Sequence, residues 1–302
     1  MTATPPSAPM PTLKPPLKPL RGVRILSLAL NLPGPAALMR CRQMGATCTK
    51  AAPPMGDPMG QYNKDAFATL HDGVKLLTID LKTEKGQQTL HKTLARTDVL
   101  LTSFRPSAMT KLGLTWRGLH KQYPQLSLVC IVGAPGARAE EPGHDLTYLA
   151  DNGLVTGMDL PPTLYADMGG SLMASEAVLQ ASLLRQTKGK GVFFEVALSD
   201  AAAYLALPRT WGLTAATGAV GGAHAGYRVY PCKDGRVAVA ALEPHFATAW
   251  CLAAGITTAG DRKFLFAPAT HQAIAAWVLT MTRKELDKLA INNDIPLHTL
   301  PR

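Results

Sequence analysis

The sequence predicts a doubly wound α/β domain with a mostly parallel, Rossmann-like sheet, followed by a smaller α+β domain. Between residues 23 and 207, short apolar segments alternate with segments of helical length and periodicity. This alternation is typical of a parallel sheet covered by helices on both faces. Beyond it the chain becomes glycine-rich and then shows a hairpin pattern. With 302 residues, 47% of them apolar, the chain can bury a core in each domain.

The strands of the larger domain are predicted from apolar runs that end at turns or polar loops. They cover residues 23–30, 46–52, 76–81, 98–104, 126–132 and 192–198. Helices are predicted between them from apolar periodicity. They cover residues 36–45, 83–96, 116–123, 168–186 and 199–207.

The composition and the positions of proline and glycine residues predict the domain boundaries. The first 20 residues contain seven prolines and no continuous apolar run, so we interpret them as a disordered tail. Residues 21–200 form the large domain, which we expect the C-terminal segment 285–302 to complete. Residues 201–221 are a predicted linker, and residues 222–284 are the small domain, with a hairpin over 227–242.

The composition and the motifs argue against several classes of protein. The formal charge of +10 comes without a long basic run, which speaks against a nucleic-acid protein and suits a small polyphosphate ligand. Five scattered cysteines without a CxxC pair indicate neither a metal site nor a disulfide framework, and they fit a reducing cytoplasm. No apolar run is long enough for a membrane span. The glycine fingerprints of nicotinamide and P-loop sites are missing, as is the GxSxG elbow.

Three polar residues lie in loops or at helix starts, where α/β folds often place catalytic side chains. His144 lies in a GHDLTY segment after a loop, where a hydrogen-bonded loop histidine is the simpler interpretation. Asp167 lies in YADMGG directly before the long helix, as an N-cap or as part of an anion site with the unshielded amides of Gly169 and Gly170. Glu243 lies in ALEPHF, where a helix-start acid is the simpler alternative.

Taken in order, these segments resemble the family III CoA-transferase and alpha-methylacyl-CoA racemase superfamily. The likeness runs over about residues 20–255 and includes DLK at 80–82, FRP at 104–106, LGL at 112–114, GHDLTY, YADMGG, GGAHAGY and ALEPHF. The chain departs from the family at 132–138, where VGAPGAR replaces a GFGQTGP-like loop, and at 71–75, where HDGVK replaces an NRGKRS-like run. Those departures put the choice of substrate and some CoA contacts in question.

The resemblance implies an enzyme of acyl-CoA thioesters. In the racemase branch, residues matching His144, Asp167 and Glu243 form the active site and interconvert 2-methylacyl-CoA epimers by two-base proton transfer. In the transferase branch, the residue matching Asp167 is a nucleophile that forms an acyl anhydride. A CoA-binding protein without catalysis is the third hypothesis.

The resemblance also implies the ligand and the assembly. No tightly bound cofactor is expected, and coenzyme A enters as part of the substrate. Lys50, Lys75 and Arg105 are the implied CoA contacts, single cations at strand ends for which surface solvation is the simpler role. An interlocked homodimer is implied, with the segment around 215–226 as its connection.

Overall fold

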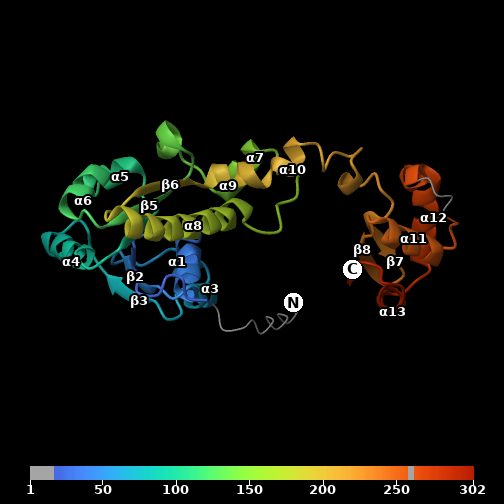
Figure 1. Cartoon of the computed structure of the whole chain (residues 1–302), viewed down its shortest axis with the longest axis horizontal. Coiled ribbons are helices and arrows are strands. Elements are labelled where there is room, and N and C mark those ends of the chain that lie inside the picture. Colours follow the sequence, from blue (N-terminus) through green and yellow to red (C-terminus); the bar gives the residue numbers. More distant parts are fainter. Residues whose placement is uncertain (1–16, 258–261) are drawn as a thin grey trace. The chain divides into compact units, whose positions relative to one another are not determined.

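The computed structural model describes residues 17–257 and 262–302, so most of the predicted tail over 1–20 lies outside the described residues. The chain divides into two compact units, one ending at Ala206 and the other beginning at Leu207. We describe each unit by itself (Figure 1). In both described ranges, none of the helices combines the length and apolar character that crossing a membrane requires.

The first unit is built on a parallel sheet of six strands. They are β1 (Arg24–Ser27), β2 (Thr47–Ala52), β3 (Lys75–Thr78), β4 (Val99–Thr102), β5 (Ser127–Val132) and β6 (Phe193–Ala197). Their order is β3-β2-β1-β4-β5-β6, with every neighbouring pair parallel. The order therefore reverses between β1 and β4, and the crevice outside the carboxyl ends of these two strands is the usual place for a ligand.

Helices cover both faces of this sheet, which confirms the predicted α/β fold. They are α1 (Pro33–Gln43), α2 (Met59–Tyr62), α3 (Lys64–Leu70), α4 (Glu84–Leu94), α5 (Pro106–Lys111), α6 (Trp116–Gln122), α7 (Asp145–Asp151), α8 (Tyr165–Lys188) and α9 (Leu198–Leu205), with the 3₁₀ turn η1 (Gly136–Glu140). Alternate residues of β5 enter two cores: Val129 packs with α1 and α8, and Leu128 packs with α4 and α6. A strand buried on both faces needs a continuous apolar sequence such as the one at 128–132.

The second unit has a three-stranded antiparallel sheet, β7-β8-β9, packed against helices. Its elements are α10 (Leu207–Thr210), η2 (Ala219–Gly221), β7 (Tyr227–Cys232), β8 (Gly235–Ala240), α11 (Pro244–Ala253), η3 (Arg262–Phe266), α12 (Pro268–Leu279), α13 (Arg283–Asn293) and β9 (Leu297–Leu300). The hairpin predicted over 227–242 is present as β7 and β8.

Two predicted boundaries are wrong. The segment 285–302 belongs to the second unit, because β9 pairs antiparallel with β8 and Leu286 is buried in the core that holds Trp250. The predicted linker over 201–221 also begins too early: Ala201 and Ala202 are buried in α9, which packs on α8. The second unit therefore begins at Leu207 rather than at residue 222.

Candidate active site

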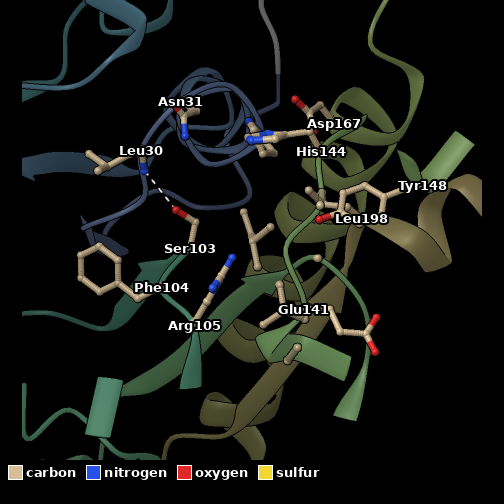
Figure 2. Close-up of a pocket in the computed structure, with 16 residues that line it drawn as sticks. Leu30, Asn31, Ser103, Phe104, Arg105, Glu141, His144, Tyr148, Asp167 and Leu198 are labelled. Atoms are coloured by element: carbon tan, nitrogen blue, oxygen red, sulfur yellow. Dashed lines mark hydrogen bonds between the residues drawn. The ribbon is translucent and has the colours of Figure 1, made fainter. Parts of the chain in front are cut away.

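A pocket opens at the carboxyl edge of the sheet, at the reversal between β1 and β4 (Figure 2). Its walls come from the segments after β1, β4 and β5 and from the first turns of α7 and α8. Its polar lining includes Asn31, Ser103, Arg105, His144, Tyr148 and Asp167. The topology thus brings together polar groups from four separate stretches of sequence, and two of these groups, His144 and Asp167, are predicted catalytic residues.

His144 is the N-cap residue of α7 and is exposed to the pocket. Thr147 satisfies both backbone groups of His144. The His144 N–H donates to Oγ1 of Thr147 at 3.0 Å, and the Thr147 hydroxyl donates to the His144 carbonyl at 2.7 Å. This local exchange fixes the start of the helix. Figure 2 shows the imidazole beside Asp167, so the two predicted catalytic side chains face the same space.

Asp167 is the third residue of α8, inside its first turn, so the prediction that it precedes the helix as an N-cap is wrong. The N-cap position is Leu164, which offers no side-chain acceptor. Asp145 supplies that acceptor from the first residue of α7: its Oδ1 accepts the Asp167 N–H at 2.9 Å. Asp145 is only 5% exposed, and it therefore ties the starts of α7 and α8 together.

The environment of Asp167 changes its acidity. Burial raises the pKa of the Asp167 carboxyl to about 6, the neighbouring Asp145 charge adds to the rise, and His144 opposes it. A carboxyl group with this pKa gains and loses protons near neutral pH, which is the range that general acid–base catalysis needs. Asp145 thus positions Asp167 and adds to the rise in its pKa that burial causes.

Gly169 and Gly170 do not form the predicted anion site. They follow the first turn of α8, so their N–H groups belong to the hydrogen-bonded interior of the helix. Their role is packing: a Cβ at Gly170 would lie 2.2 Å from Cδ2 of Leu198, and one at Gly169 would lie 3.3 Å from Cβ of Ala201. The two glycines let α9 approach α8 closely.

Tyr148 is a functional candidate that the sequence analysis missed, although it ends the GHDLTY segment. Its side chain is buried in the pocket wall. Its hydroxyl fits between Gly133 and Gly143, where added Cβ atoms would lie 2.3 and 2.6 Å away. Burial raises the pKa of the Tyr148 phenol and the Asp167 charge adds to that rise, so the hydroxyl keeps its proton and can donate it in a hydrogen bond.

The three residues predicted to contact CoA lie in different environments in the structure. Arg105, the N-cap residue of α5, is exposed, and Figure 2 shows its guanidinium directed into the pocket. Lys50 is 1% exposed and forms an ion pair with Asp57 at 2.7 Å, so it offers no free cation. Lys75 begins β3 beside Thr49, at the amino end of the strand and away from the carboxyl edge. The predictions for Lys50 and Lys75 as phosphate contacts are therefore wrong.

Glu243 belongs to the second unit. It follows β8 and is the exposed N-cap residue of α11, with Pro244 in the first position of the helix. Its side chain makes no cap hydrogen bond there. A role beside His144 stays a prediction.

Comparison with known proteins agrees with this geometry. The family model for CoA-transferase family III matches residues 20–301. The chain belongs to CoA-transferase family III. This confirms the superfamily that the motifs predicted, which includes both CoA-transferases and alpha-methylacyl-CoA racemases.

Relatives of both kinds are similar to this family III chain. A succinyl-CoA–D-citramalate CoA-transferase of Chloroflexus aurantiacus is 29% identical over 93% of the chain and 78% of its own length. The alpha-methylacyl-CoA racemase of Mus musculus is 31% identical over 75% of the chain and 62% of its own length.

The probable fatty acyl-CoA transferase Rv3272 of Mycobacterium tuberculosis is 32% identical over 64% of the chain. The chain spans about half the length of this relative, 53%. A crystal structure of Rv3272 matches with a TM-score of 0.81 at 25% identity, covering 94% of this chain and 85% of that one.

The raised pKa of Asp167 predicts a stability effect. The ordinary pKa is 3.8, so between that value and about 6 the folded protein holds a proton that the unfolded chain releases. Ionisation of Asp167 therefore opposes folding at pH 7 and ceases to do so below pH 3.8. We expect Asp167→Asn to raise the free energy of unfolding at pH 7 by about 1 to 2 kcal/mol, because partial solvation reduces the full difference.

Urea titrations at neutral and acidic pH measure this effect. The exposed Asp159 provides the control, since Asp159→Asn removes a carboxylate without removing a buried charge. The gain for Asp167→Asn is expected to disappear at acidic pH. Equal stability of Asp167→Asn and the wild type at neutral pH would contradict the assignment of a buried, destabilising carboxylate.

Proposed function

We propose that this protein acts on acyl-CoA thioesters and racemises 2-methylacyl-CoA by two-base proton transfer. The observation that carries the proposal is the shared pocket of His144 and Asp167, in which the pKa of the Asp167 carboxyl is raised to about 6. Inversion at the α-carbon requires a base on one face and an acid on the other. An imidazole and a carboxyl group that titrates near neutral pH suit these two roles.

The proton transfer runs as follows. The neutral imidazole of His144 takes the α-proton, the C–H electron pair moves into the thioester carbonyl to form an enolate, and protonated Asp167 delivers its proton to the opposite face. This leaves an imidazolium and a carboxylate, which catalyse the reverse inversion or exchange protons with water. The Tyr148 hydroxyl donates a hydrogen bond to the enolate oxygen.

Coenzyme A is proposed to lie along the carboxyl edge of the sheet. Arg105 contacts a phosphate group, as its position in the pocket allows. A second, apolar cavity shares Leu30 and Phe104 with this pocket, and its lining also includes Leu28, Ala51, Ile79, Leu81 and Lys82. A flat adenine ring fits such a cavity, and Lys82 takes the place that the sequence analysis gave to Lys50 and Lys75.

CoA transfer is the second candidate, favoured by the same buried carboxylate. Asp167 would attack the thioester carbonyl, and the C–S bond would break to give an acyl anhydride and the CoA thiolate. The thiolate would displace the donor acid from Asp167, and the acceptor carboxylate would displace CoA from the aspartyl thioester to form a second anhydride. The thiolate would then attack the acceptor's carbonyl, which gives the new acyl-CoA and frees Asp167. Several relatives are CoA-transferases, the Chloroflexus aurantiacus protein among them. A CoA-binding protein without catalysis is the third candidate, because the loop over 132–138 departs from the family pattern. The interlocked homodimer likewise stays a prediction.

Deuterium uptake separates these candidates. Incubated with one epimer of 2-methylacyl-CoA in deuterated water and without an acceptor acid, the wild type is expected to invert the α-carbon and to incorporate deuterium there. His144→Ala and Asp167→Asn should each reduce inversion by a factor of about 100 or more, because each removes one of two required groups. Mass spectrometry and chiral chromatography provide the readouts.

Exposed residues of the same types, replaced in His298→Ala and Asp159→Asn, are the controls and should keep wild-type rates. If CoA exchange requires a second carboxylic acid and no deuterium is taken up, racemisation is contradicted and CoA transfer is the function. In that case hydroxylamine should trap an acyl group on Asp167.

Arg105 and Lys75 form a matched pair for testing the CoA position. Arg105 lies in the pocket and Lys75 at the amino end of β3. Arg105→Ala should weaken CoA binding about tenfold, the loss of one charge-assisted contact, whereas Lys75→Ala should leave it unchanged. Calorimetric titration with CoA measures both. Equal affinities of Arg105→Ala and the wild type would remove Arg105 from the site.

A further inference from the structure

A buried ion pair stands directly behind one wall of the pocket. Lys50 on β2 and Asp57, in the loop before α2, have side chains that are 1% and 0% exposed, and their charged atoms are 2.7 Å apart. Two charges removed from water are unfavourable unless hydrogen bonds satisfy their remaining atoms. The hydrogen-bond partners of Lys50 and Asp57 therefore indicate what the buried pair does.

Both charged groups hold the backbone of one short turn, residues 29–34, which we call the Asn31 turn. Lys50 Nζ donates to the carbonyl of Ala29 at 2.5 Å. Asp57 Oδ1 accepts the N–H of Asn31 at 3.0 Å and the N–H of Met59 at 3.0 Å. Between these two anchored residues, the N–H of Leu30 donates to Ser103 Oγ at 3.1 Å. Three successive residues of the turn are thus fixed from outside it.

The backbone of the Asn31 turn needs such support. Asn31 has φ of 64°, one of two non-glycine residues with positive φ in the described part of the chain. This left-handed conformation is unfavourable for residues that carry a Cβ atom, although asparagine tolerates it better than most. The turn is also tightly closed, since a Cβ at Gly34 would lie 2.2 Å from Cβ of Ala29.

The Asn31 turn is part of the pocket that contains His144 and Asp167. Leu30, Asn31 and Pro33 line it, and Figure 2 shows Asn31 on the same side as the His144 imidazole. A change of φ at Asn31 would therefore move the wall against which a ligand lies.

One further titratable group faces the ion pair. His71 is 5% exposed, its Nδ1 lies 2.7 Å from the carbonyl of Phe67, and its buried Nε2 has no hydrogen-bond partner within the described residues. Burial lowers the pKa of His71 and the Lys50 charge lowers it further, against the opposing effects of Phe67 and Asp57. The imidazole is therefore neutral at pH 7 and leaves Lys50 and Asp57 as a balanced pair of charges.

We propose that Lys50 and Asp57 are positioning residues of the candidate active site, which hold the Asn31 turn in the conformation that shapes the pocket. Neither residue touches the ligand: they act through the carbonyl of Ala29 and the N–H of Asn31. The inference rests on the proposed function only in that this pocket binds acyl-CoA, and it applies equally to racemisation and to transfer.

Two double variants separate the charge of the pair from its hydrogen bonds. Lys50→Met with Asp57→Asn removes both charges but keeps an Oδ1 acceptor for Asn31. Lys50→Met with Asp57→Leu removes the acceptor as well, and apolar replacement of a buried ion pair often preserves stability. Arg42→Met with Asp72→Asn, which removes an ion pair with the exposed Asp72, is the control.

The readouts are amide hydrogen exchange of Asn31 by NMR, CoA affinity by calorimetry, and deuterium uptake into 2-methylacyl-CoA. The Asp57→Leu double variant is expected to exchange the Asn31 amide at least tenfold faster and to bind CoA at least tenfold more weakly, at a melting temperature close to that of the wild type. The Asp57→Asn double variant should retain most of the Asn31 protection, and the control pair should change nothing.

Unchanged Asn31 exchange and unchanged CoA affinity in the folded Asp57→Leu double variant would overturn the proposal. If that variant does not fold, the wild type still decides, because an Asn31 amide that exchanges as fast as a free loop amide would also overturn it. Failure of the proposed function has a different signature. The wild type would then take up no deuterium, while the Asn31 exchange would still respond to the variants.

Discussion

The hydrogen bond from the Asp167 N–H to the Asp145 carboxylate governs the geometry of this site. It joins the first turns of α7 and α8, so His144 at the start of one helix and Asp167 at the start of the other face a single pocket. It also keeps a buried negative charge beside Asp167, which adds to the effect of burial on that carboxyl group. One contact thus fixes where the acid–base pair stands and adds to the effect of burial on the pKa of Asp167.

The sheet topology supplies the rest of the site. Because the strand order reverses between β1 and β4, the segments that follow these strands diverge and leave a crevice. Arg105 enters it after β4, and the Asn31 turn enters it after β1. The turn is held by Lys50 and Asp57, so the residue first expected to bind phosphate instead shapes the pocket from behind.

The features that the sequence predicts correctly are those that depend on local sequence patterns. The parallel sheet follows from apolar strands alternating with helices. The resemblance of short motifs to the family singled out His144, Asp167 and Arg105, which line one pocket in the structure. The errors arise where a partner far along the chain decides the outcome. The burial of Lys50 depends on Asp57 in the next loop, and the placement of 285–302 depends on the pairing of β9 with β8. The position of Asp167 in its helix was missed because its capping acceptor comes from α7.

The pKa of Asp167 tests this account most directly. Carbon-13 NMR of the labelled aspartate carboxyl groups, assigned with Asp167→Asn, follows its titration in the free protein. We predict a pKa of about 6 for Asp167, and a lower value in Asp145→Asn, which keeps the hydrogen-bond acceptor but removes the neighbouring charge. Titration at the ordinary value of 3.8, or a raised pKa that Asp145→Asn leaves unchanged, would contradict it.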